Sequence, residues 1–194
     1  MHNSSYEHMR DVVSRYLDPQ QPMSIVDIGS CDVNGSYRTL FGNEKWTYTG
    51  IDLEAGPGVD VVLKSPYSLP FPSGSFDLAV SGQAFEHVEY FWMSWLEMLR
   101  VLKPAGKIFL IAPSRGPEHR YPQDCWRFYP DGYRALAKYA SCELIEVTTD
   151  WEPHPDPGSQ AWGDTVGVFR KLPLGRRARV FHMMMRIANR LQTG

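Results

Sequence analysis

The sequence has few cysteines and no long apolar run, and each absence excludes a class of protein. Its three cysteines, Cys31, Cys125 and Cys142, are odd in number and form no C-x-x-C pair, so neither a zinc ribbon nor a disulfide framework is expected. A reducing, cytoplasmic setting is the simplest interpretation. The polar N-terminus lacks the apolar core of a signal peptide, and no apolar run approaches the roughly 20 residues that cross a bilayer.

The chain also lacks an excess of either positive or negative charge. The 20 basic and 22 acidic residues leave a formal net charge of -2, so the chain as a whole is not attracted to nucleic acid, and no such partner is expected. The length of 194 residues and the hydrophobic content of 43% are typical of one globular domain with its own core.

Short apolar runs alternate with helical patterns along most of the chain. Strands are predicted over 24–29, 47–53, 59–63, 76–81, 107–112, 143–151 and 165–171. Helices are predicted over 4–17, 36–41, 89–103 and 130–140, and Pro104-Ala105-Gly106 should form a turn after the third of them. This alternation favours an α/β fold with a doubly wound, mostly parallel sheet and helices on both faces.

Three loops of such a sheet should carry ligand-binding residues, because ligands bind beyond the carboxyl ends of the strands. The first predicted strand leads into Asp27-Ile28-Gly29-Ser30-Cys31, where glycine lets the backbone approach a ligand closely. The second ends at Asp52, a suitable partner for ribose hydroxyls. The fourth leads into Gly82-Gln83-Ala84-Phe85-Glu86-His87. A nucleotide-like ligand is indicated, but the G-x-G-x-x-G pattern of NAD-binding proteins is missing, since Cys31 occupies its second glycine position.

One long segment carries a family resemblance. Residues 69–113 read LPFPSGSFDLAVSGQAFEHV, later LEMLRVLKPAGKIFLIAP. With the DIGS loop and the TGID acid, the chain resembles the type 11, small-molecule group of class I S-adenosylmethionine-dependent methyltransferases over about residues 24–113. The resemblance implies a Rossmann-like, seven-stranded sheet whose last strand is antiparallel, with S-adenosyl-L-methionine as the cofactor.

The resemblance also assigns roles within the cofactor site. Gly29 would lie against the methionine moiety with Asp27 beneath it, although Asp27 could instead only orient the loop. Asp52 would bind the ribose. The remaining expected cofactor residues are Ser30, Cys31, Leu53, Ser65, Gly82 and Gln83. Ser65 stands where relatives often carry an acid for the adenine amino group, so adenine recognition would rest on Ser65 or on backbone groups.

Methyl transfer from a sulfonium is an in-line displacement that the protein assists by alignment, and a hydroxyl acceptor also needs a base. The candidate bases are His87, His119 and Asp124. Their alternatives are structural, since His87 could orient its loop and Asp124 could pair with Arg127. In relatives that methylate phenols, a similar E-x-x-E-H segment binds a divalent cation. Gln83 replaces the first acid here, so no metal site is predicted.

The segment 114–128 is the best candidate for an acceptor site. It combines histidine, acids, arginines and aromatics in a long loop, and such loops are usually functional. This mixture suits a sugar or a phenol, and HRYPQDCWRFYPDG is similar to methyltransferases of glycan biosynthesis. O-methylation of a sugar or small molecule is therefore expected. The alternatives are N- or C-methylation, or a non-catalytic protein that binds S-adenosylmethionine. The acceptor and the oligomeric state stay open.

The last residues differ from the rest. The methyltransferase domain is assigned to residues 1–171, and 172–194 to a separate helix, because no acid follows Asp164 while basic residues recur. Its apolar residues share one helical face: Val180, Phe181, Met184, Ile187, Ala188 and Leu191. A basic amphipathic helix of this kind could lie peripherally on an anionic inner-membrane face, contact a protein, form an oligomer, or pack on its own domain.

Overall fold

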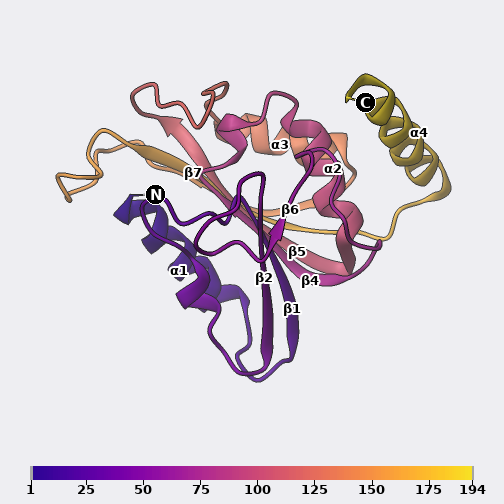
Figure 1. Ribbon diagram of the computed structural model, residues 1–194, viewed down its shortest axis with the longest axis horizontal. Coiled ribbons are helices and arrows are strands. Elements are labelled where there is room, and N and C mark those ends of the chain that lie inside the picture. The colour runs from indigo at the N-terminus through magenta and orange to yellow at the C-terminus, as the bar shows by residue number, and fades with distance from the viewer. Residues whose placement is uncertain (1, 194) are drawn as a thin grey trace.

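The apolar runs of the sequence form one sheet in the computed structural model, which describes residues 2–193 (Figure 1). Its strands are β1 (Met23–Ile28), β2 (Trp46–Asp52), β3 (Val61–Val62), β4 (Phe76–Gly82), β5 (Leu102–Arg115), β6 (Glu143–Thr149) and β7 (Gly163–Arg170). They lie in the order β3-β2-β1-β4-β5-β7-β6, with β7 antiparallel to both of its neighbours. The predicted mostly parallel sheet with an antiparallel last strand is confirmed.

Both faces of the sheet are buried, because successive side chains of a strand point to opposite sides. In β4, Leu78 and Val80 join one core cluster while Ala79 joins the other. The alternation continues in β5, where Phe109 packs with the first cluster and Ile108 with the second. Parallel strands covered on both faces are accordingly almost continuously apolar.

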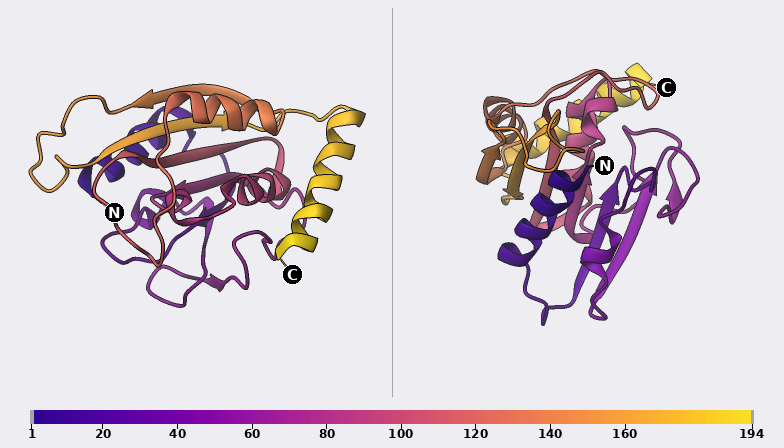
Figure 2. Two further views of the ribbon diagram at one scale, coloured as in Figure 1. Left: turned by 90° about the horizontal axis from the view of Figure 1, so that it is seen from above. Right: turned by 90° about the vertical axis from the view of Figure 1, so that its left-hand side faces the viewer.

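Helices cover the two faces (Figure 2). They are α1 (Asn3–Tyr16), α2 (Phe91–Val101), α3 (Pro130–Tyr139) and α4 (Arg176–Thr193), with short 3-10 helices η1 (Arg38–Phe41) and η2 (Phe85–His87). α1 buries Met9 and Val12 in the first cluster, whereas α2 and α3 bury residues such as Trp95 and Tyr133 in the second. Proline at the first position of α3 suits a helix start, where its missing N–H is not needed.

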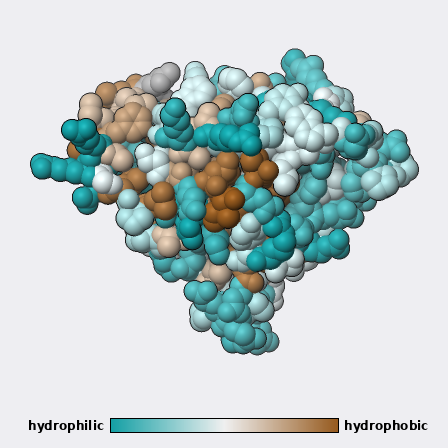
Figure 3. Space-filling model, turned by 180° about the vertical axis from the view of Figure 1, so that it is seen from behind, coloured by the Kyte–Doolittle hydropathy of each residue, from teal (hydrophilic) through white to brown (hydrophobic). Residues whose placement is uncertain are grey.

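α4 lies at the margin of the molecule, where it contacts α2 (Figures 1 and 2). Several of its apolar side chains are exposed, among them Val180, Met184, Ile187 and Leu191. No helix among residues 2–193 is long and apolar enough to cross a membrane. On the face shown in Figure 3, a patch of apolar side chains is surrounded by hydrophilic ones.

Some element boundaries differ from the sequence prediction. β3 has only two residues, and the short helix expected over 36–41 is a 3-10 helix limited to Arg38–Phe41. The predicted turn at 104–106 lies within β5, which begins at Leu102. Phe76 pairs with Leu102 and the regular pairing resumes between Leu78 and Lys107, so the extra residues form an irregularity in the strand. The turn pattern in the sequence therefore marks the point where regular strand pairing is interrupted, but the segment stays within the sheet.

Ala105 generates a stability prediction, because its φ of 62° lies in the left-handed region. A Cβ disfavours that conformation by about 1–2 kcal/mol, and glycine adopts it readily. Ala105→Gly should therefore raise the free energy of unfolding by about 0.5–1 kcal/mol in urea denaturation. Ala135→Gly, on the exposed side of α3, is the control and should lower it by about 1 kcal/mol. Equal destabilisation by both substitutions would contradict the prediction.

Candidate active site

The loop after β1 is shaped by a close approach to the loop after β4. Gly29 has φ +84°, and a Cβ there would lie 2.4 Å from Cβ of Ala84. Only glycine fits both constraints. The N–H groups of Gly29 and Ser30 donate to the carbonyl oxygen of Ile51 at 2.9 and 3.1 Å, and the Ser30 hydroxyl donates to the Gly58 carbonyl at 3.0 Å. The loop is thus held between β2 and β4.

Asp52 lies directly beside this loop. One carboxylate oxygen accepts a hydrogen bond from the N–H of Cys31 at 3.0 Å, and the other accepts from Leu53 at 2.7 Å. These bonds fix the carboxylate but leave it further acceptor capacity. Leu53 is 45% exposed, so an apolar surface is open next to the acid. The arrangement can receive a ribose and a neighbouring base, as the sequence predicts.

Asp27 is buried one residue before the end of β1. One of its oxygens accepts a hydrogen bond from the Tyr48 hydroxyl, while Oδ1 has no partner among the described residues. Burial raises the pKa of Asp27 to about 7, against the smaller lowering effect of the Tyr48 hydrogen bond. With this pKa the Asp27 carboxyl can ionise at neutral pH, and it could then pair with a cationic group bound above β1.

The other predicted cofactor residues occupy varied surroundings. Gly82 packs against the ring of Tyr37, where a Cβ would lie within 2.3 Å. Ser65, in the loop after β3, accepts a hydrogen bond from the Tyr67 N–H at 3.2 Å. Gln83 turns its amide toward α1 and β7, donating to Ser5 Oγ at 3.2 Å and Asp164 Oδ1 at 2.9 Å. The Gln83 side chain therefore anchors other elements, and its backbone is the part that borders the loop.

The polar contacts that hold α1 over this edge were not predicted from the sequence. The Ser5 and Tyr37 hydroxyls lie 2.5 Å apart, and His8 Nε2 lies 2.8 Å from Asp150 Oδ2. His2 stacks on Trp162 with ring centroids 5.4 Å apart. Burial raises the pKa of Asp164 to about 6. Contacts over such sequence separations leave no local pattern that could have predicted them.

The structure brings two predicted bases together with Glu86. The rings of His87 and His119 meet edge to face with centroids 4.8 Å apart. Nε2 of His87 lies 3.6 Å from Glu86 Oε1, and Nε2 of His119 lies 3.9 Å from the same oxygen. We call Glu86, His87 and His119 the polar cluster. Ala84, which touches Gly29, is only two residues from Glu86, so the cluster lies next to the loop after β1.

Glu86 is fully buried, and neither of its carboxyl oxygens has a hydrogen-bond partner among the described residues. Burial raises its pKa to about 8. A buried carboxyl without partners is costly, and such groups concentrate at functional sites. The sequence marked Glu86 only as part of the family motif, and its isolation depends on the surrounding loops.

The segment 114–128 folds back onto η2 through backbone contacts. The N–H groups of Cys125 and Trp126 donate to the Glu86 carbonyl at 2.7 and 3.2 Å. The Gln123 amide donates to the His87 carbonyl at 2.9 Å, and His87 Nδ1 lies 2.5 Å from the Gln123 carbonyl oxygen. Since that oxygen can only accept, Nδ1 carries the proton and Nε2 of a neutral His87 has a free lone pair.

Asp124 holds the segment together. Its carboxylate accepts two hydrogen bonds from Arg127 at 2.5 and 2.8 Å and a third from the His119 N–H at 2.8 Å. The Arg127 guanidinium keeps the pKa of Asp124 far below its usual range. The geometry therefore favours the structural alternative for Asp124, which would position His119 and accept no proton at neutral pH.

The polar cluster also has a spacing that suits a divalent cation, since one ligand atom from each residue lies within 4.8 Å of the others. Gln83, at the position of the missing acid, points away toward Asp164. His8, Asp150 and Asp164 form a second group with this spacing, but His8 and Asp150 already bond each other at 2.8 Å.

Comparison with known proteins agrees with this geometry. Residues 26–110 match the family described as "Methyltransferase domain". Residues 26–110 therefore belong to a methyltransferase domain, and the chain has the Rossmann-like fold of the class I, S-adenosylmethionine-dependent methyltransferases. An uncharacterized methyltransferase of Mycobacterium tuberculosis is 29% identical over 143 residues, covering 66% of this chain and 54% of the relative. The chain thus spans about half the length of the curated relatives it matches.

Two solved structures illustrate what the fold implies. The 1,6-didemethyltoxoflavin-N1-methyltransferase of Burkholderia thailandensis, solved with S-adenosylhomocysteine, has a TM-score of 0.63 and 18% identity, covering 88% of this chain and 85% of that one. The cyclase SpnF has a TM-score of 0.65 and 15% identity, covering 87% and 81%. At such identities the likeness shows the fold alone, and it is shared by proteins of different named activity.

The cofactor site yields a binding prediction. Asp52→Ala removes the ribose partner and the acceptor of two loop N–H groups, so the affinity for S-adenosylmethionine should fall at least about tenfold, as one charge-assisted hydrogen bond is worth about 1.5–3 kcal/mol. Isothermal titration calorimetry measures it. Glu44→Ala, at an exposed position, should bind like the wild type. Unchanged affinity of Asp52→Ala would remove Asp52 from the site.

Glu86 yields a pH prediction. The folded chain retains its proton up to about pH 8, whereas the unfolded chain releases it near the ordinary pKa of 4.5. The contribution of Glu86 to stability is therefore fully present below pH 4.5 and is lost as the pH rises toward 8. Glu86→Gln should lose less stability than the wild type between pH 5 and 8 in chemical denaturation. The exposed Glu89→Gln should follow the wild type, and the same course for Glu86→Gln would refute the prediction.

Proposed function

We propose that the protein transfers the methyl group of S-adenosylmethionine to a hydroxyl of a sugar or another small molecule. The observation that supports this most is the polar cluster, which follows the strand next to the cofactor loop. Ala84 touches Gly29, and Glu86 and His87 come two and three residues later. An acceptor bound at the cluster would lie close to the methionine end of the cofactor, where alignment for in-line displacement is needed.

The cluster is accessible from outside. The side chain of His119 is 24% exposed and that of His87 is 13% exposed, whereas Glu86 is closed off. Tyr121 lies near both rings, with centroids 6.2 and 6.4 Å away, and is largely exposed. The polar cluster beside the exposed ring of Tyr121 suits a sugar or phenol, whose flat face can pack on the ring while its hydroxyl groups meet the polar side chains.

His87 is the proposed base. Burial lowers its pKa, so the imidazole is neutral at physiological pH, and the Gln123 carbonyl holds the proton on Nδ1. The hydroxyl proton would move to Nε2 as the acceptor oxygen forms its bond to the methyl carbon. The bound cofactor would supply the methyl group and keep the electrons of its carbon–sulfur bond on sulfur, which would give S-adenosylhomocysteine and a methyl ether. His119 would orient the acceptor from the facing side of the cluster.

Other acceptors stay open at this site. An amine carries its own lone pair and needs less help from a base, so N-methylation would depend less on His87. A protein that binds the cofactor without transferring methyl groups would need no cluster at all. Loss of turnover without loss of cofactor binding in cluster variants therefore excludes the non-catalytic alternative, and a larger loss in His87→Ala for hydroxyl than for amine acceptors favours O-methylation.

α4 favours contact with an anionic membrane surface as a secondary feature. Its exposed side presents Val180, Met184 and Ile187, and its first turn presents Arg176 and Arg177. Exposed apolar and basic side chains on one helix are typical of interfacial binding. Flotation with anionic vesicles tests this contact, and a protein that stays in the dense fraction would exclude it.

The imidazoles yield a kinetic prediction. His87→Ala should lower kcat about 10²–10⁴-fold, as expected for loss of a general base, with unchanged affinity for S-adenosylmethionine. His119→Ala should lower kcat and raise KM for the acceptor. Formation of S-adenosylhomocysteine over a panel of sugars and phenols measures both.

The control variant is His154→Ala, whose imidazole pairs with Glu7 instead. A chelator should leave the wild-type rate unchanged. A rate that falls with chelator and is restored by a divalent ion would show that the cluster acts by binding a cation and not by supplying a base. Full turnover of His87→Ala would overturn the base assignment.

A further inference from the structure

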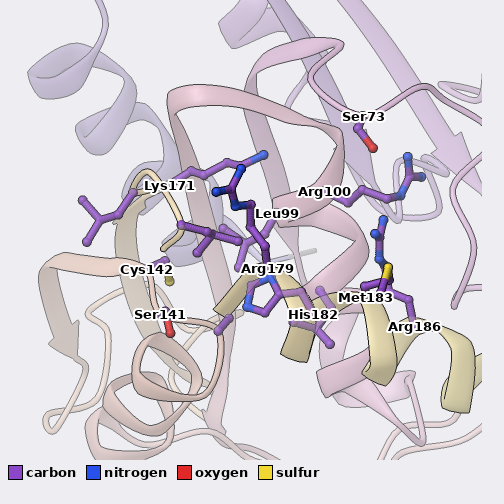
Figure 4. A pocket seen from close by; sticks show the side chains of 14 residues that line it. Ser73, Leu99, Arg100, Ser141, Cys142, Lys171, Arg179, His182, Met183 and Arg186 are labelled. Carbon is purple, nitrogen blue, oxygen red and sulfur yellow. The ribbon is translucent and has the colours of Figure 1, made fainter. Parts of the chain in front are cut away.

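A second hollow lies away from the cofactor loops, beneath α4 (Figure 4). Its volume is about 360 Å³. Lys171, which follows β7, lines it and donates to the carbonyl of Leu102 at the beginning of β5. The parallel strands begin at this edge, whereas the cofactor loops follow their ends. The hollow is therefore separate from the methyl-transfer site.

The charged side chains of the hollow are all basic, and they come from α2, the end of β7 and α4 (Figure 4). Arg100 pairs with Glu97 at 2.7 Å, so its charge is compensated. Lys171, Arg179 and Arg186 have no acidic partner among residues 2–193. No aspartate or glutamate lines the hollow. Three uncompensated cations therefore surround one partly enclosed space.

This concentration of positive charge is unfavourable while the hollow is empty. Burial and the charges of Arg100 and Arg186 lower the pKa of Lys171. Nε of Arg186 and Nε2 of His182 are buried without a hydrogen-bond partner among the described residues. Buried donors without acceptors cost free energy, and a bound anion would supply both acceptor oxygens and the opposite charge.

We propose that this hollow binds a ligand in which a phosphate group is joined to an apolar moiety. Guanidinium groups match the oxygens of a phosphate in geometry and charge, which favours Arg179 and Arg186 as its main partners. The rest of the lining is largely apolar and includes Leu99, Leu172 and Met183, which suits an attached hydrocarbon. The proposal goes beyond methyl transfer, because the ligand occupies neither the cofactor loops nor the polar cluster.

Binding would hold α4 against the body of the protein, since Arg179, His182 and Arg186 belong to α4 while Lys171 and Leu99 do not. The exposed apolar side chains of α4 would stay on the outside. Two sources can supply this ligand chemistry: the headgroup of a phospholipid in a membrane, or a soluble phosphorylated metabolite. Experiments with the full chain distinguish them.

Octyl phosphate is the probe for the hollow itself. Titration calorimetry should show one saturable site in the wild type, and neutral octyl glucoside should not compete for it. Arg179→Gln/Arg186→Gln should weaken the binding at least tenfold. The matched control, Arg10→Gln/Lys45→Gln, removes the same charge from exposed positions outside α4 and should bind like the wild type. Affinity for S-adenosylmethionine should be equal in all three proteins.

Vesicle flotation identifies the source. Binding to phosphatidylglycerol vesicles but not to phosphatidylcholine vesicles, lost in Arg179→Gln/Arg186→Gln and kept in the control, assigns the site to a lipid headgroup. Binding of octyl phosphate without flotation assigns it to a soluble ligand. The proposal is overturned if the wild type binds neither probe at millimolar concentration, or if the two double variants behave alike. Cofactor binding and turnover test the proposed function independently.

Discussion

The close approach of Gly29 to Ala84 is the constraint on which the active site depends. β1 and β4 are neighbours in the middle of the sheet, where the strand order reverses, so the loops after them leave in opposite directions. The loops after β1 and β4 can approach this closely only if one of them has no side chain at the contact, and Gly29 satisfies that condition with a positive φ. Asp52 and the polar cluster are placed on either side of this contact.

The two sides of the site are stabilised differently. Backbone hydrogen bonds hold the cofactor side, with Asp52 joined to the N–H groups of Cys31 and Leu53. The proposed acceptor side depends on segment 114–128, which closes onto η2 and in which Asp124 bonds both Arg127 and the His119 N–H. Loops change in sequence more easily than strand ends, so the proposed acceptor side could vary while the cofactor side stays the same.

The sequence predicted the strands of the sheet well, for a physical reason. Parallel strands buried on both faces are continuous apolar runs, so the positions of Gly29 directly after β1 and of Asp52 at the end of β2 could be predicted without coordinates. Ala105 shows the limit of local signals: a turn pattern was present, yet backbone hydrogen bonds of Ala105 and Gly106 with Lys171, directly after β7, keep the segment within β5.

Long-range contacts explain what the sequence could not predict. Glu86 is isolated because Cys125 and Trp126 close over its backbone from almost 40 residues away. The Gln83 side chain turns to Asp164, and α1 contacts the site through Ser5. Residue spacing in the sequence could not predict either contact. The pairing of Asp124 with Arg127 was foreseen as an alternative, and only geometry could favour it over a role as a base.

Calorimetric titration of the full chain with S-adenosylmethionine tests the central claim most directly, since every role assigned to the two loops assumes that this cofactor lies between them. One molecule should bind per chain with micromolar affinity, and S-adenosylhomocysteine should compete for the same site. Absence of heat at millimolar cofactor, or binding that S-adenosylhomocysteine does not displace, would contradict it.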